Sequence, residues 1–372
     1  MSPPLSAVPR PGSLKYRSLF ALLLGLANMA LAAPPLPALN IDIKQTSISG
    51  LSSGGFMAVQ FQVAHSATVK GAGVIAGGPY YCSRDNLLTA VAQCSCTGEP
   101  SVPCAVTANS TDVPGLVRST HELAARGLID PPAALAGQKV QTLSGSKDTL
   151  VPTPIVRQLA DFYTALGLPA ANLSTITLTN AAHTMPTPKF GIACGTQDEP
   201  YIGKCGFDTA KSILSWIYGP LKAASGSKAK GRFVEFEQSA YLPPGGGFSW
   251  KSGLDNSGWL YVPNSCAKGE PCRLHIVLHG CKQGQNFLPL HPPPGGGLYN
   301  GTTFVKNTGY NRWADNNHLV ILYPQAVSIP LLNPNGCWDW WGYSGADYAT
   351  KNGVQIQTLK AMVDRLGAAA KP

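Results

Sequence analysis

Residues 49–56 of this 372-residue chain read Ser-Gly-Leu-Ser-Ser-Gly-Gly-Phe and contain the pattern G-x-S-x-G centred on Ser52. The alternating run 41–48 before it predicts a strand, and the run 56–65 after it predicts a helix. In that context the pattern is typical of a nucleophile elbow, a sharp turn that exposes a serine hydroxyl at the end of a strand. Because a bare G-x-S-x-G also occurs in inert turns, the flanking strand and helix carry this interpretation.

Strand-like and helix-like runs alternate along the rest of the chain. Such alternation predicts an α/β fold with a mostly parallel central sheet and helices on both faces. Further strands are expected at 69–75, 139–143, 174–178, 233–236, 258–262, 274–278 and 319–323. Further helices are expected at 116–127, 154–166, 207–218, 310–317 and 354–366.

The first 32 residues predict a secretory signal peptide. The basic residues Arg10, Lys15 and Arg17 come first, and an apolar run follows at 19–31. The run ends in the A-x-A cleavage site Ala30-Leu31-Ala32. The apolar run is too short to span a bilayer comfortably. We therefore expect a secreted protein, either extracellular or periplasmic, that does not insert into a membrane. Residues 33–372 are expected to form its single catalytic domain.

The net charge is +9, from 28 basic and 19 acidic residues, and the basic residues are scattered. This distribution does not form a nucleic-acid footprint, so no nucleic-acid partner is expected. The ten cysteines form an even set, which in an exported chain favours disulfides.

Cysteine spacing suggests mostly local disulfide loops. We expect Cys82 to pair within the group Cys94, Cys96 and Cys104, and we expect the pairs Cys194 with Cys205, Cys266 with Cys272, and Cys281 with Cys337. Zinc bound by Cys94, Cys96 and Cys104 is the alternative. Their spacing is poor for a zinc knuckle and no histidine is close, so no metal is expected.

A serine nucleophile needs a base and a group that orients the base. In α/β-hydrolases these residues follow the serine in the order Asp or Glu, then His. Asp148 follows the expected strand 139–143, and His183 follows the expected strand 174–178. Active sites in open α/β sheets lie at the ends of such strands. Each residue alone is compatible with an ordinary turn, but their joint order behind the elbow predicts a triad of Ser52, His183 and Asp148.

His279 and Gly280 end the expected strand 274–278. In α/β-hydrolases a His-Gly segment supplies the second N–H of the oxyanion hole. The two donors here would be the backbone amides of Ser53 and Cys281, which can stabilise a developing negative charge.

That His-Gly strand ordinarily precedes the elbow, whereas here it follows it. We therefore expect a circular permutation, with the original ends joined through residues 222–231, whose composition is typical of a flexible linker. Two separate domains joined by this linker are the alternative. Permutation is favoured because neither half alone holds both the triad and the oxyanion strand.

Together these motifs resemble the secreted polyhydroxybutyrate (PHB) depolymerases, in the subgroup with the lipase box near the N-terminus and a circularly permuted α/β-hydrolase fold. The resemblance covers essentially the whole chain after residue 32. It rests on the segments 50–54, 144–148, 182–186, 278–283 and 337–340. It implies the same triad and oxyanion residues as those above.

The resemblance also implies that an aromatic side chain near the site holds a hydroxybutyrate unit. Trp338, Trp340 and Trp341 are the matching candidates, and core packing is the alternative role for each. Many secreted members carry a separate polymer-binding domain, whereas this sequence ends after its last expected helix. We therefore expect a preference for amorphous polymer or oligomers, or a periplasmic role.

The resulting expectation is an exported, monomeric serine esterase that cleaves PHB or its oligomers through an acyl-enzyme and needs no cofactor. A feruloyl, acetyl-xylan or other short-chain carboxylesterase is the first alternative. A non-catalytic exported protein that binds carbohydrate or polymer through its tryptophans is the second.

Overall fold

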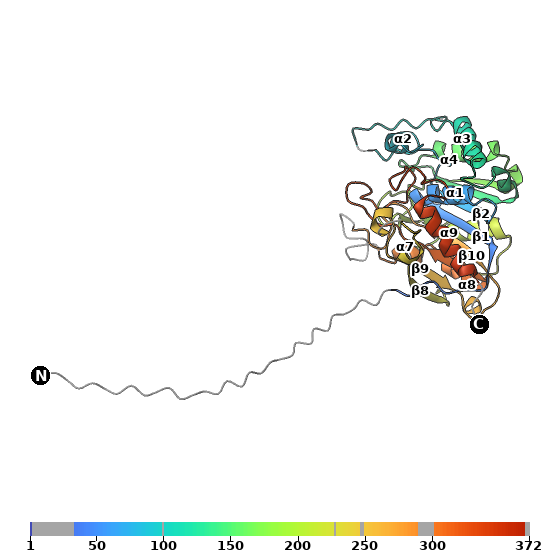
Figure 1. The fold of residues 1–372 in the computed structure, drawn as a ribbon, viewed down its shortest axis with the longest axis vertical. Helices are drawn as coiled ribbons and strands as arrows, with labels where there is room; N and C mark the ends of the chain where they lie inside the picture. The colour runs from blue at the N-terminus through green and yellow to red at the C-terminus, as the bar shows by residue number, and fades with distance from the viewer. Residues whose placement is uncertain (2–32, 99, 227, 246–248, 289–300, 369–372) are drawn as a thin grey trace. The chain divides into compact units, whose positions relative to one another are not determined.

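An eight-stranded sheet organises the part of the chain that the computed structural model describes, namely residue 1 and residues 33–98, 100–226, 228–245, 249–288 and 301–368 (Figure 1). Its order is β4 (Leu173–Leu178), β3 (Lys139–Gly145), β2 (Val69–Ile75), β1 (Ile41–Leu51), β10 (Cys272–Leu278), β11 (Leu319–Tyr323), β9 (Ser257–Val262) and β8 (Arg232–Glu237). Neighbours from β4 to β11 pair in parallel, and β9 is antiparallel to both of its neighbours. The expected mostly parallel α/β fold is confirmed.

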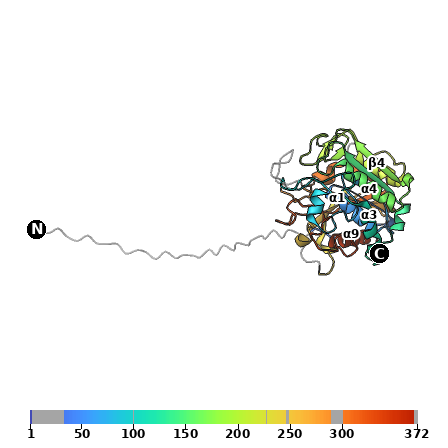
Figure 2. The same cartoon turned by 90° about the horizontal axis from the view of Figure 1, so that it is seen from above.

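Helices cover both faces of this sheet. The α-helices are α1 (Ser53–Ala64), α2 (Leu87–Ala92), α3 (Val113–Ala125), α4 (Thr153–Ala165), α5 (Thr209–Tyr218), α6 (Asn264–Ala267), α7 (Thr303–Asn307), α8 (Tyr310–Asn316) and α9 (Val354–Gly367). Helices α1 and α9 lie side by side (Figures 1 and 2), and both contact Asp339. Helices α5 and α8 lie on the other face, where Tyr218 and Tyr310 bond to Ser47 and Ser49 of β1.

The centre of the sheet is buried, and this explains why a strand such as β11 is apolar throughout rather than alternating. All five residues of β11 are buried, and all twelve residues of α1 are buried as well. Parallel strands covered on both faces carry near-continuous apolar runs. Helix α1 is mostly apolar, and its Gln60 and Gln62 form hydrogen bonds inside the protein, as expected of an interior helix. The elbow serine therefore lies between a buried strand and a buried helix, which restricts its movement.

The two ends of the described domain meet beside β1. The Leu39 amide donates to the Leu366 carbonyl over 3.0 Å, and Arg365 Nε donates to the Leu36 carbonyl over 2.9 Å. Accordingly, the red helix α9 lies beside the blue strand β1 in Figure 1. The last helix thus ends where the chain enters the elbow strand, which is the juxtaposition that a permuted order requires.

Segment 222–231 is attached to the domain by hydrogen bonds at several of its described residues, whereas its composition suggested flexibility. Asp315 of α8 accepts hydrogen bonds from the amides of Lys230 and Gly231 over 2.7 and 3.1 Å. The Lys222 amide donates to Asn317 Oδ1 over 2.8 Å. A sequence of small residues can become ordered when a neighbouring carboxylate accepts hydrogen bonds from its backbone amides. The composition of the segment alone does not reveal that Asp315 is this partner.

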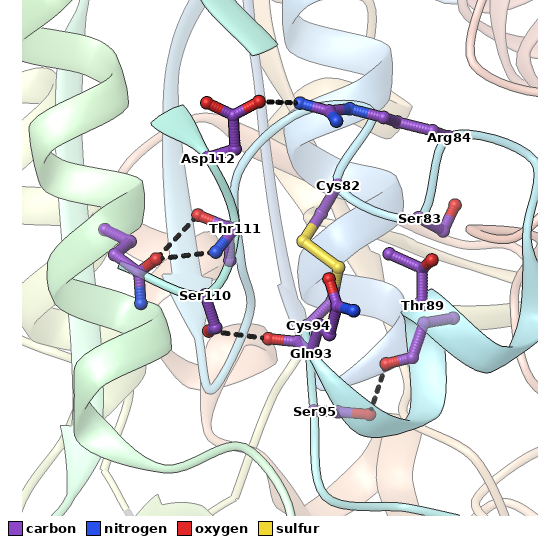
Figure 3. The surroundings of a disulfide bond; sticks show 12 residues. Cys82, Ser83, Arg84, Thr89, Gln93, Cys94, Ser95, Ser110, Thr111 and Asp112 are labelled. Carbon is purple, nitrogen blue, oxygen red and sulfur yellow. Dashed lines mark hydrogen bonds and ion pairs between the residues drawn. A yellow bond between two sulfur atoms is a disulfide. The ribbon is translucent and has the colours of Figure 1, made fainter. Parts of the chain in front are cut away.

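Five disulfides join the ten cysteines, as Cys82–Cys94, Cys96–Cys104, Cys194–Cys205, Cys266–Cys272 and Cys281–Cys337. The expected pairs are confirmed, and the zinc alternative is wrong because its three cysteines are all in disulfides. Figure 3 shows the Cys82–Cys94 bond next to the Arg84–Asp112 ion pair.

Within the described residues, no helix combines the length and apolar character needed to cross a membrane. The predicted signal peptide, apart from residue 1, lies outside the described residues.

Replacing Gly54 by alanine is expected to lower the free energy of unfolding by about 2 kcal/mol or more. A Cβ at this position would lie 2.3 Å from the His279 carbonyl oxygen, so the end of β10 would have to move. The midpoint of urea denaturation measures the change. Gly137→Ala is the control, because nothing lies within 4 Å of the Cβ that it would add. Equal midpoints for Gly54→Ala and the wild type would contradict this close packing.

Candidate active site

Ser52 occupies a strained turn between β1 and α1. Its backbone angles are φ 57° and ψ −123°, a sparsely populated region for a residue with a side chain. Its amide donates to the Ile75 carbonyl over 2.9 Å, which holds the turn against β2. A Cβ on Gly50 would lie 2.1 Å from the Gly54 carbonyl oxygen, so the pattern needs glycine where the backbone crosses itself. The strand-turn-helix expected from residues 49–56 is confirmed.

Asp148 and His183 form a buried pair. Asp148 Oδ2 lies 2.8 Å from His183 Nδ1, and the two side chains are 0% and 5% exposed. Asp148 Oδ1 accepts the amides of Leu150 and Val151 over 2.9 and 2.8 Å. With the carboxylate held on both oxygens, Nδ1 of the imidazole carries a proton and Nε2 is left as the basic nitrogen.

A small second sheet holds the His183 loop. Its strands are β5 (Met185–Thr187), β7 (Ile202–Lys204) and β6 (Ile192–Ala193), closed by the Cys194–Cys205 disulfide. The Ala182 amide donates to Cys194, and the Met185 amide donates to Tyr201, so both flanks of His183 are fixed. The Tyr201 ring also packs edge-on against the imidazole, with 6.1 Å between ring centroids. Strands of two or three residues give no periodic signal, and the sequence did not predict this sheet.

Ser52 and His183 line one cavity of about 710 Å³. Both residues are largely buried, at 8% and 4% exposure. Within the described residues no hydrogen bond joins the Ser52 hydroxyl to His183, so the structure brings the two side chains to one cavity without closing their contact.

Ser53 and Cys281, the residues expected to form the oxyanion hole, both lie close to Ser52. Ser53 begins helix α1, so its N–H has no acceptor within that helix. Cys281 follows β10 and lines the cavity. A Cβ on Gly280 would lie 3.3 Å from Ser52 Cβ, which places the late His-Gly turn directly against the elbow. Within the described residues neither amide donates to a protein acceptor.

Two of the three candidate tryptophans reach the cavity. Trp340 and Trp341 line it, and Trp340 stacks on Phe56 with ring centroids 4.1 Å apart. Trp338 is fully buried, packs against His279 and is not part of the lining. The expectation of a substrate contact therefore does not hold for Trp338 in this structure, because its ring is enclosed by the core.

Asp339 shapes this wall of the cavity, a role that was not predicted from the sequence. Its carboxylate accepts the amides of Trp341, Gly342 and Tyr343 over 2.7 to 3.2 Å. It also accepts the amide and hydroxyl of Ser344. Burial raises the pKa of Asp339, and the hydrogen bonds from Ser344, Gly342 and Tyr343 oppose that effect. An aspartate with a glycine three residues later, as in Asp339 and Gly342, is compatible with a turn, and this is the signal that could have identified it.

Exposed apolar side chains line the mouth of the cavity, and none was singled out from the sequence. They are Leu87, Leu88, Leu331 and Leu332. Leu87 and Leu88 begin the short helix α2, and the other two lie on a loop before Asp339. Isolated leucines in loops and short helices give no periodic pattern.

Known proteins resemble this chain over most of its length. It is 42% identical over 341 residues to the poly(3-hydroxybutyrate) depolymerase of Delftia acidovorans, covering 91% of this chain and 62% of that protein. It is 38% identical over 363 residues to the polyhydroxybutyrate depolymerase of Talaromyces funiculosus, covering 93% of this chain and 96% of that protein. The chain belongs to the PHB depolymerase family. No protein-family model matches it.

Solved structures of PHB depolymerases share the fold. The PHB depolymerase of Penicillium funiculosum superposes with a TM-score of 0.77 at 35% identity, over 91% of this chain and all of that one. A serine-to-alanine PHB depolymerase complexed with an R3HB trimer gives the same values. The α/β-hydrolase fold of the family is therefore shared by this chain.

A buried polar network lies beneath the elbow of this family member. His275 on β10 lies 2.6 Å from Ser47 Oγ and 2.8 Å from Ser49 Oγ. Tyr218 and Tyr310 bond to the same two hydroxyls. Burial lowers the pKa of His275 to about 3, so the imidazole is neutral at neutral pH. The network joins β1 to β10 three residues before Ser52.

The stability of the protein is expected to fall as the pH drops from 6.5 toward 4.5. Unfolded His275 gains a proton near pH 6.5, whereas the folded residue does not until about pH 3. Each pH unit in this window therefore favours unfolding by about 1.4 kcal/mol through this residue. His275→Gln should flatten the pH dependence of the urea midpoint, and His121→Gln, at an exposed helix position, should not. Identical pH dependence for His275→Gln and the wild type would contradict a buried neutral imidazole.

Proposed function

We propose that this chain is an exported serine esterase that hydrolyses ester bonds of poly(3-hydroxybutyrate) or its oligomers. One observation supports the proposal above all. In this member of the family, a strained Ser52 and a His183 that is hydrogen-bonded to Asp148 line the same cavity. The chain spans 62% of the length of its Delftia relative, so the activity is argued from this chain's own residues.

The proposed reaction uses His183 as the base. Nε2 of His183 takes the proton of the Ser52 hydroxyl as Oγ attacks the ester carbonyl, and Asp148 stabilises the imidazolium. The Ser53 and Cys281 amides donate to the oxyanion of the tetrahedral intermediate, a contribution worth several kcal/mol of barrier lowering. The imidazolium then protonates the leaving alcohol, which leaves an acyl group on Ser52.

Deacylation repeats these steps with water. His183 removes a proton from the water molecule, the hydroxide attacks the acyl carbonyl, and Ser52 leaves with its proton restored. The products are a shorter chain ending in a carboxylate and a free hydroxyl-ended fragment. No step calls for a cofactor or a metal.

The cavity supports a polyester substrate. Its volume of about 710 Å³ falls in the usual range for small-molecule sites, and Trp340, Trp341 and four leucines make much of its lining apolar. A related depolymerase structure holds an R3HB trimer. A feruloyl, acetyl-xylan or other short-chain ester would use the same machinery, and only a substrate comparison separates these possibilities.

Export is supported by the five disulfides among the described residues and by the predicted signal peptide. We place the catalytic domain at residues 33–372, with residues 222–231 as the join of the permuted ends, and we propose that the protein acts as a monomer. The contact between Leu39 and Leu366 supports the permutation.

The purified protein should release soluble 3-hydroxybutyrate or its oligomers from amorphous PHB, measured by chromatography of the supernatant. Ser52→Ala should lower the rate by about 10⁴-fold or more, and Asp148→Asn by about 10⁴-fold. Ser215→Ala, which removes a hydroxyl bonded only within helix α5, should leave the rate unchanged. Hydrolysis of acetyl or feruloyl esters with no release from PHB would favour the alternative substrates. Retained activity in Ser52→Ala would reject the proposed nucleophile.

A further inference from the structure

His279 is fully buried and makes two hydrogen bonds through its ring. The Ala326 amide lies 3.0 Å from Nε2, and the Gly280 carbonyl oxygen lies 2.7 Å from Nδ1. A backbone amide can only donate, so Nε2 must be unprotonated. A carbonyl can only accept, so Nδ1 must carry the hydrogen. One neutral tautomer satisfies both bonds.

The surroundings of the ring keep it in that form. Trp338 and Phe304 pack against it at centroid distances of 5.6 and 6.1 Å. Burial lowers the pKa of His279 to about 4, and the bond to Gly280 only partly offsets this. A charged ring would place a second N–H against the Ala326 amide, so protonation is opposed by geometry as well as by desolvation.

The Gly280 carbonyl belongs to the same planar peptide group as the Cys281 amide. In a trans peptide the C=O and N–H point in opposite directions, so a bond that fixes the oxygen also fixes the direction of the N–H. Cys281 lines the cavity, and its amide has no protein acceptor among the described residues. The imidazole and the cavity therefore contact opposite sides of one peptide group.

We propose that His279 is a positioning residue whose Nδ1–H, by donating to the Gly280 carbonyl, aims and polarises the Cys281 amide toward the oxyanion of the substrate. The inference rests on the proposed function, because it assigns a task to a residue behind the oxyanion hole. Hydrogen bonds in a chain polarise one another, so donation to the carbonyl strengthens the amide as a donor.

Other groups hold the rest of the turn by hydrogen bonds, and His279 holds the Gly280–Cys281 peptide. Gln283 Oε1 accepts the Gly280 amide over 2.6 Å. Its Nε2 donates to the Pro200 and Tyr201 carbonyls over 2.8 and 3.1 Å. The Lys282 amide donates to Asn335 over 2.7 Å. These bonds hold the peptides on either side of the Gly280–Cys281 group and connect the turn to the Tyr201 loop beside His183.

Two substitutions separate this role from core packing alone. In His279→Asn the amide nitrogen takes the place of Nδ1, so the bond to Gly280 is kept and the bond from Ala326 is lost. In His279→Gln the amide oxygen reaches the place of Nε2, so the bond from Ala326 is kept and the bond to Gly280 is lost. Both variants remove the ring and one hydrogen bond.

Turnover of a soluble butyrate ester and of a 3-hydroxybutyrate trimer provides the readout. His279→Gln should lower kcat about 100-fold with KM within about 2-fold, since full loss of an oxyanion donor costs about 10²–10³ in kcat. His279→Asn should retain kcat within about 10-fold of wild type. Urea midpoints of both variants report the loss of stability separately. Equal losses of kcat in the two variants would overturn the proposal.

The tautomer can be measured without turnover. Nitrogen-15 NMR of histidine-labelled protein, assigned with His279→Asn, should show His279 protonated at Nδ1 and unprotonated at Nε2 at pH 7. A proton on Nε2 would overturn the proposal. A wild type inactive on every ester would reject the proposed function and this inference with it. An active wild type with indistinguishable variants would reject this inference alone.

Discussion

The close backbone contact between helix α1 and the end of β10 is the constraint on which the rest of the site depends. Gly54 approaches the His279 carbonyl so closely that no side chain fits between them. This contact brings the His279–Cys281 turn against Ser52 although the two are more than two hundred residues apart in the chain. The Cys281–Cys337 disulfide then attaches the Trp340 and Trp341 wall to the same turn. A looser contact would separate the elbow from the Cys281 amide, which we propose as the second oxyanion donor.

Parallel strands explain why the remaining residues converge. Strands β1, β3, β4 and β10 run in the same direction, so Ser52, Asp148, His183 and His279 all follow strand ends on one edge of the sheet. The permuted order does not disturb this edge, because the sheet fixes where each strand ends regardless of where the chain begins. The Leu39 amide donates to the Leu366 carbonyl, so the end of α9 lies beside the segment that leads into β1, as the proposed permutation requires.

Much of this arrangement could be predicted from the sequence because it rests on local patterns. Apolar runs located the strands, and G-x-S-x-G located the elbow at Ser52. Short cysteine spacings favoured local loops, although only the structure distinguishes Cys94 from Cys96 and Cys104 as the partner of Cys82. The order of Asp148 and His183 behind the elbow identified the pair that the structure brings into contact.

Other features depend on tertiary contacts that leave no local pattern. Trp338 lies two residues from Trp340 and three from Trp341, yet the fold buries it and presents the other two to the cavity. The hydrogen bonds of Asp339 depend on a turn that wraps around its carboxylate. The leucines at the cavity mouth come from helix α2 and from a separate loop. The tautomer of His279 depends on Ala326, which is distant in sequence.

The most direct test of the account is to label the protein with a fluorophosphonate and to locate the adduct by peptide mass spectrometry. Such reagents react with a serine that is activated by a neighbouring base beside an oxyanion hole. The account predicts one adduct, on Ser52, formed far more slowly when His183 is replaced by glutamine. An adduct on another serine, or labelling of Ser52 at the same rate without the imidazole, would contradict it.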